Sequence, residues 1–169
     1  VNNRSLTIRG TMERYNGGAF KSGSGAYPLA TVTFAGTASQ TVGGATGDFS
    51  GTNRFCNLKI DNPSGVTIGA NGLIEVSNTL YLTNGIITTT ATSRLVLMNT
   101  ATTAVVPDGG SASSFVSGPL TKYIVNGESF NFPVGKGTVA GHDFTVTATG
   151  GSTLPYTVEF FTPNTNATS

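Results

Sequence analysis

Short pairs of apolar residues recur through the first part of the chain, separated by Asn, Gly or Pro. In residues 55–87 such a pair or triplet comes every six to eight residues. The two apolar residues of a pair have one residue between them, so both point to the same face of an extended strand. The pattern therefore predicts short β-strands that each bury one face.

The apolar pairs fall into three columns, in which successive members lie 20 to 26 residues apart. A period of this size is typical of a coil with three strands and three turns. The columns are Val32/Phe34, Leu58/Ile60 and Leu80/Leu82; Val42, Val66/Ile68 and Ile86; and Ile74/Val76 with Leu95/Leu97. The residues between the apolar positions are expected to face outward, among them Lys59, Thr67, Glu75 and Tyr81.

An Asn follows four of the predicted strands, at Asn62, Asn78, Asn84 and Asn99. Asn tolerates left-handed backbone angles and bonds its own main chain, so it suits the corner of a coil. Asn62 and Asn84 lie one 22-residue coil apart, and we expect their amides to stack. A meander of antiparallel hairpins is the alternative, because Asn84-Gly85 would also suit a hairpin turn.

The pattern changes after Val106, where Pro107-Asp108-Gly109-Gly110 predicts a joint and longer strands follow. A two-residue turn at Asn126-Gly127 predicts a hairpin that pairs Val125 with Glu128, Tyr123 with Phe130, and Thr121 with Phe132. That register puts Tyr123, Val125, Phe130 and Phe132 on one face, and Lys122, Ile124, Ser129 and Asn131 on the other.

The sequence therefore predicts an all-β chain in two parts. Residues 1–107 are expected to form a short parallel β-helix or β-solenoid with an N-terminal strand. Residues 108–169 are expected to form an antiparallel, β-sandwich-like domain that caps the open end of the coil, where unpaired strand edges would otherwise invite aggregation.

Composition limits the classes of partner. Charged residues make up 10% of the chain, the net charge is +1, and the nine Lys and Arg residues are scattered. We therefore expect no nucleic-acid partner. No stretch approaches the roughly 20 apolar residues of a membrane span. Cys56 is the single cysteine, so an intrachain disulfide cannot form.

Several stretches follow one another in a familiar order: "FAGTASQTVGG", then "FCNLKIDNPSGVTI" with "TLYLTNGII", then "SFVSGPL" and "FNFPVG". Over about residues 30–160 the chain resembles the β-rich modules of large, adhesin-like cell-surface proteins that Bacteroidetes export by type IX secretion. The resemblance implies a secreted or cell-surface module, one among many in an adhesin or surface filament. Two features depart from it: no sorting domain follows Ser169, from which we expect a longer parent chain, and Gly141-His142-Asp143 replaces the usual aromatic residue and Pro.

Catalytic chemistry finds little support in the sequence, and we expect no enzyme activity. His142 and Asp143 are neighbours, and adjacent side chains of a strand point to opposite faces. The carboxylates of the coil segment, which are Asp48, Asp61, Glu75 and Asp108, form no apparent pair of the kind that glycosidases use. "FPVGKGT" departs from a phosphate-binding loop, because Phe130 stands where Gly is needed and Gly137 follows Lys136.

We expect no cofactor. A calcium ion would want several carboxylates in one loop, and Asp108-Gly109-Gly110 supplies one, so a site completed by main-chain carbonyls is the weaker alternative. Ice binding would need a regular Thr array, whereas Thr88, Thr89 and Thr90 are consecutive.

These features predict a non-enzymatic extracellular structural module: a stiff, protease-resistant spacer, stalk or filament unit. The alternative is a carbohydrate-binding module that stacks a glycan on Tyr15, Tyr27 or Tyr81, and the third is a polysaccharide-cleaving β-helix enzyme. The expected partners are neighbouring modules or copies of the chain in a head-to-tail polymer. Leu6, Thr7, Ile8 and Arg9 are the candidate assembly strand, which would add to a neighbour's sheet; the alternative is that this strand caps its own domain.

Overall fold

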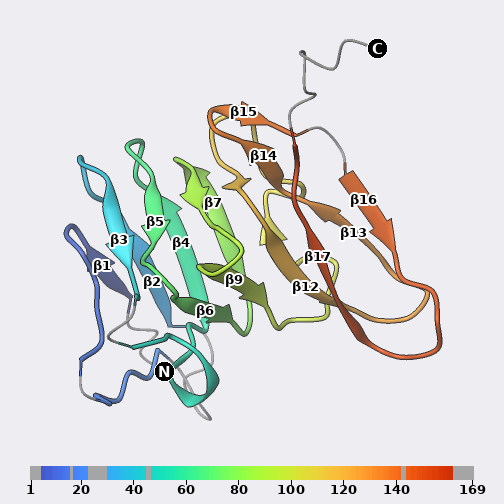
Figure 1. Ribbon diagram of the computed structural model, residues 1–169, viewed down its shortest axis with the longest axis horizontal. Helices are drawn as coiled ribbons and strands as arrows, with labels where there is room; N and C mark the ends of the chain where they lie inside the picture. The colour runs from blue at the N-terminus through green and yellow to red at the C-terminus, as the bar shows by residue number, and fades with distance from the viewer. Residues whose placement is uncertain (1–4, 16, 23–29, 45–46, 142–143, 162–169) are drawn as a thin grey trace.

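The computed structural model describes residues 5–15, 17–22, 30–44, 47–141 and 144–161. Within these ranges the regular structure is all-β, apart from one 3₁₀ turn, η1 (Gly51–Asn53). The strands form a β-solenoid of about four turns. Figure 1 shows the strands side by side along the long axis of the molecule, from β1 at one end to β16 at the other.

Three parallel sheets run along the solenoid. Sheet A contains, in spatial order, β1 (Leu6–Ile8), β2 (Thr31–Phe34), β4 (Asn57–Asp61), β7 (Leu80–Asn84) and β10 (Val105–Val106). Sheet B contains β3 (Gln40–Val42), β5 (Val66–Ile68), β8 (Ile87–Thr88), β11 (Val116–Ser117) and β14 (Val134–Lys136). Sheet C contains β6 (Leu73–Val76), β9 (Arg94–Leu97) and β12 (Leu120–Ile124).

Antiparallel strands close the C-terminal end. β15 (Val139–Ala140) pairs with β14, and β17 (Leu154–Val158) pairs with β12. β13 (Ser129–Phe132) and β16 (Phe144–Thr147) form a separate two-stranded sheet. The predicted fold class, a parallel solenoid followed by antiparallel strands, is thus confirmed, and the meander alternative is wrong for the coil.

The apolar columns form the core between the three sheets. In sheet A, Val32 pairs with Leu58, which pairs with Leu80, and all three are buried. In sheet C, Ile74 pairs with Leu95 and Val76 with Leu97, as predicted. Each strand therefore adds one buried layer to the layer of the previous coil.

One member of the predicted columns is wrong. Val66 of sheet B pairs with Ile87, which is buried, and not with Ile86, which is half-buried. The turn after β7 takes up both Gly85 and Ile86, so the alternation of inward and outward residues restarts one position later.

Gly85 is required where the main chains of two coils meet. Its φ is +90°, and a Cβ at this position would lie 1.7 Å from the carbonyl oxygen of Asn62 in the previous coil. Only glycine combines this backbone angle with so close an approach.

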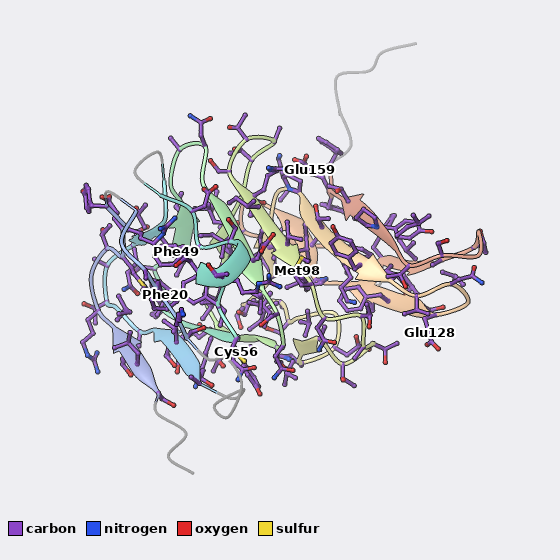
Figure 2. All side chains as sticks on the ribbon, turned by 90° about the horizontal axis from the view of Figure 1, so that it is seen from below. Phe20, Phe49, Cys56, Met98, Glu128 and Glu159 are labelled. Atoms are coloured by element: carbon purple, nitrogen blue, oxygen red, sulfur yellow. The ribbon has the colours of Figure 1, made fainter. Side chains whose placement is uncertain are left out.

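Three phenylalanines close the core at the N-terminal end, and Figure 2 labels two of them, Phe20 and Phe49. Phe49 and Phe55 stack with ring centroids 5.0 Å apart, and the ring of Phe20 meets both edge-on at 5.2 Å. Phe49 also forms an isolated parallel bridge with Ile74, and Phe55 one with Val76, so this cluster continues sheet C toward the N-terminal end.

The predicted hairpin between β12 and β13 is wrong. The turn itself is present, since the Glu128 N–H donates to the Val125 carbonyl at 3.0 Å. Beyond the turn, however, β12 pairs with β9 and β17, whereas β13 pairs with β16. Pairing with the preceding coil overrides the local turn, because it extends the buried column of sheet C from Leu95 to Leu120.

The buried face of β12 is the one with Lys122 and Ile124, and not the one that the hairpin register groups with Phe130 and Phe132. Lys122 and Ile124 are buried, and Tyr123 is half-buried on the outward face. Phe130 and Phe132 share one face of β13, as predicted, and both are buried. The boundary between residues 107 and 108 stays a prediction, and parallel pairing continues beyond it through β11, β12 and β14.

Candidate functional site

Buried amides occupy the corner where sheet A passes into sheet B. Gln40 donates through Nε2 to the carbonyls of Ile8, at 3.0 Å, and Gly10, at 2.8 Å. Asn62, one coil later, donates through Nδ2 to Gln40 Oε1 at 2.9 Å and to the Ala38 carbonyl at 2.8 Å. Each amide therefore bonds the coil that precedes its own.

The predicted stack of the Asn62 and Asn84 amides is not formed. The two residues are joined through the main chain, by the Asn62 N–H and the Asn84 carbonyl at 3.0 Å. The Asn62 side chain turns toward Gln40 because this corner is buried, and a buried amide needs partners for both its oxygen and its nitrogen.

A second ladder lies where sheet C returns to sheet A. Asn57, Asn78 and Asn99 are spaced 21 residues apart. Asn78 donates through Nδ2 to Asn57 Oδ1 at 2.7 Å, and Asn99 donates through Nδ2 to the Asn78 carbonyl at 2.9 Å. Asn57 Oδ1 also accepts the Thr79 N–H at 3.2 Å. Asn78 and Asn99 are among the predicted corner residues and Asn57 is not, although the 21-residue spacing points to it.

Lys122 ends this ladder. Its ammonium group donates to the carbonyl of Asn99, in the place that a further Asn would occupy, and to the carbonyl of Tyr123 at 2.6 Å. The residue is 0% exposed, and Nζ lies 4.9 Å from the centroid of the Phe130 ring. Burial lowers the pKa of Lys122 to about 8. The predicted hairpin register put Lys122 on the face opposite Phe130, whereas its ammonium group lies over the Phe130 ring.

The carboxylates of the coil are engaged in local structure. Asp61 lies 3.2 Å from Lys59, and Asp48 accepts the Leu73 N–H at 2.7 Å. Glu75 accepts the Gly51 N–H at 2.8 Å, and its Oε2 lies 3.8 Å from Arg54 Nε. The part of the chain that the structure describes contains no group of three or more His, Cys, Asp or Glu side chains able to hold a metal ion.

The remaining candidates for chemistry lie in the C-terminal part. His142 and Asp143 are outside the described residues. Lys136 of the "FPVGKGT" stretch forms an ion pair with Glu159 at 3.0 Å. Asp108 is exposed beside Gly109, whose φ is +68°.

Tyr15 and Tyr81, the two predicted sugar-binding tyrosines among the described residues, do not lie on one strand. Tyr15 is 61% exposed, donates to Glu13 and follows Arg14, whose side chain bonds the Asp48 carbonyl where the coil enters sheet C. Tyr81 is half-buried on the outward face of sheet A, beside Lys59. Tyr27 lies outside the described residues.

The candidate assembly strand forms the edge of its own sheet. Leu6, Thr7 and Ile8 are β1, which pairs in parallel with β2, and Arg9 donates to the Ala35 carbonyl at 3.0 Å. Leu6 is 45% exposed. No strand of the described residues pairs with the outer edge of β1.

A row of hydroxyls that the sequence analysis overlooked follows the outward face of sheet B. Thr41 pairs with Thr67, Thr67 with Thr88, and Thr88 with Ser117. Thr88 is thus aligned with its neighbours across the coils and not with Thr89, which is buried and donates to the Pro119 carbonyl at 2.8 Å. The row is one hydroxyl wide, narrower than the flat array that ice binding requires.

Comparison of the chain with family models, with curated proteins and with solved structures found no match. Among the described residues, no helix is long and apolar enough to cross a membrane.

Proposed function

We propose that the chain is a non-enzymatic structural module of the extracellular space, which serves as a stiff spacer or stalk unit in a cell-surface filament or adhesin. The observation that carries this proposal is that buried and half-buried polar side chains link neighbouring coils. Gln40, Asn62, Asn78, Asn99 and Lys122 each bond a neighbouring coil.

Bonds of this kind stiffen the coil, because separating two coils would leave buried donors and acceptors without partners. Ser114 and Thr89 add further links between coils, to the carbonyls of Gly85 and Pro119, both at 2.8 Å. Polar groups that hold coils together in this way are not free to bind or transform a substrate. The resemblance to type IX-secreted modules supports the extracellular location.

The location and the lack of turnover can be tested together. Immunogold labelling of intact source cells should mark the outer surface. The purified chain should neither bind a glycan array nor hydrolyse polysaccharides, and Tyr81→Ala should behave as wild type. Labelling confined to the cell interior, glycan binding that Tyr81→Ala abolishes, or polysaccharide hydrolysis would each overturn the proposal.

A further inference from the structure

The two ends of the solenoid carry its strongly exposed large apolar side chains. Among the described residues, none of these side chains belongs to the coils between residues 30 and 105. They are Leu6 and Tyr15 at one end, and Val106, Val125, Val139, Phe144, Leu154 and Phe161 at the other. A clustering of apolar surface at both ends of an elongated molecule marks the ends as interaction surfaces.

The ends also differ in charge. Residues 1–54 carry five Lys or Arg and two Asp or Glu, a net charge of +3. Residues 55–104 carry two of each sign, whereas residues 105–169 carry two Lys and four Asp or Glu, a net charge of −2. The two ends of one copy would therefore attract the opposite ends of other copies.

Three charged side chains at the ends, Arg9, Arg14 and Glu128, form no ion pair with another described residue. The guanidinium groups of Arg9 and Arg14 bond main-chain carbonyls. Glu128 is exposed at the C-terminal end, and Figure 2 shows it far from Phe20 at the opposite end. These side chains are therefore available for ion pairs with a partner.

Both ends present an open strand edge of similar composition. β1 reads Leu-Thr-Ile, and β16 reads Phe-Thr-Val-Thr. Each strand has a single partner among the described strands, β2 for β1 and β13 for β16, and Figure 1 places the two strands at opposite ends of the long axis. An unpaired edge is a template for a strand from another chain.

We propose that the partner of these ends is a second copy of the chain, and that β16 of one copy pairs with β1 of the next. The inference rests on the proposed structural role and adds the mode of assembly. A contact between two different surfaces does not close on itself unless the rotation between copies closes a ring, so it generates a filament.

The main chain of β1 indicates where to block this contact. The Ala35 N–H of the neighbouring coil donates to the Ile8 carbonyl at 2.9 Å, so the main-chain groups of Ile8 face β2. Those of Thr7 then face the open edge, because the direction alternates along a strand. Thr7→Pro removes the outward N–H and leaves the pairing of β1 with β2 in place.

The test measures the mass of the 169-residue chain by sedimentation velocity at low ionic strength, from micromolar to millimolar protein. Wild type should grow beyond the 17.2 kDa of one chain, and electron microscopy should show fibres one molecule wide. Thr7→Pro should remain at the monomer mass, whereas Thr7→Val, which keeps the N–H, should assemble as wild type does.

A second pair of variants probes the other end. Phe144 is exposed on β16, and Thr67 is exposed on sheet B in the middle of the solenoid. Phe144→Lys should abolish assembly, and Thr67→Lys, which adds the same charge away from the ends, should not. Circular dichroism checks that each variant keeps its β-structure.

A wild-type chain that stays monomeric at every concentration overturns the proposal and leaves the ends to a partner of another sequence. Folded Thr7→Pro or Phe144→Lys chains that assemble like wild type overturn it as well. Either result leaves the spacer function untouched, since that function is tested by surface labelling and by glycan assays.

Discussion

The strands in the middle of the solenoid and the strands at its C-terminal end bury their side chains very differently. In β7, Leu80 and Leu82 are fully buried and alternate with outward residues. In β16 and β17 none of the residues is fully buried. A middle strand has a coil on each side and a core beneath it, whereas β16 has β13 as its single partner among the described strands.

This difference in burial indicates which part of the molecule provides stability and which part is available for interaction. The coil buries its apolar side chains and pairs its buried polar groups within the chain. Substitutions inside it should therefore lower the free energy of unfolding. The strands β16 and β17, here called the cap, expose apolar side chains and an unpaired strand edge. Substitutions there should alter association and have little effect on the free energy of unfolding. Four substitutions test this contrast.

The largest effect is expected inside the coil, from Leu82→Asp. Leu82 is fully buried between β4 and the following coil, so the new carboxylate would be buried without a partner. We expect a loss of about 4 kcal/mol in the free energy of unfolding. The neighbouring Thr83 is exposed, and Thr83→Asp should change it little. Equal midpoints for the two variants in urea denaturation would show that the assignment of inside and outside is wrong.

Gly85→Ala tests the close approach of two coils. Its Cβ would overlap the Asn62 carbonyl oxygen, and the backbone would be strained at φ +90°. We expect a loss of about 3 kcal/mol. Gly127 provides the matched control, because its φ is +86° and nothing lies within 4 Å of its Cβ position. Gly127→Ala should cost about 1 kcal/mol, so similar losses would contradict a steric role for Gly85.

Lys122 should make stability depend on pH. The lysine ammonium has an ordinary pKa of 10.5, and burial lowers it to about 8 in the folded chain. Between these two values the unfolded chain binds the proton more strongly, so the free energy of unfolding should rise with pH in this window. We expect a rise of about 3 kcal/mol, since each tenfold difference in proton affinity between the two states contributes about 1.4 kcal/mol.

Substitution separates this contribution from other titrations. Lys122→Met should remove the rise between pH 8 and pH 10.5, as measured by urea denaturation at a series of pH values. Lys59→Met changes a lysine whose side chain is 34% exposed and pairs with Asp61, and it should keep the rise. A Lys122→Met chain with the pH dependence of wild type would refute a buried, desolvated ammonium.

The smallest effect on stability is expected in the cap. Phe144 is 48% exposed on β16, so Phe144→Ser should lower the free energy of unfolding by at most about 0.5 kcal/mol. The contrast with Leu82→Asp can be measured in the same denaturation experiment. A loss of several kcal/mol would mean that Phe144 is buried in solution and that the cap resembles the coil.

Parts of the candidate site could be read from single residues and parts could not. The corner positions of Asn62, Asn78 and Asn99 follow from Asn after an apolar strand. The partners of these amides did not follow, because hydrogen-bond geometry depends on how far each coil is offset from the previous one. Asn57 escaped notice because it stands at the start of a strand and not past its end.

The alternation of apolar residues and its repeat along the chain predicted the coil, its outward residues and its inward columns apart from Ile86, and the tertiary structure decided against the antiparallel meander. A strand that is buried on one face must alternate apolar and outward residues, and one coil of three short strands and three turns takes about 20 residues. Both features can therefore be read directly from the sequence. Tertiary structure alone decided that β12 joins β9 and not β13, and that Lys122 is buried as the end of an Asn ladder. A turn such as Asn126-Gly127 selects only a local conformation, whereas the choice among neighbouring strands depends on the apolar surface that each long-range pairing buries.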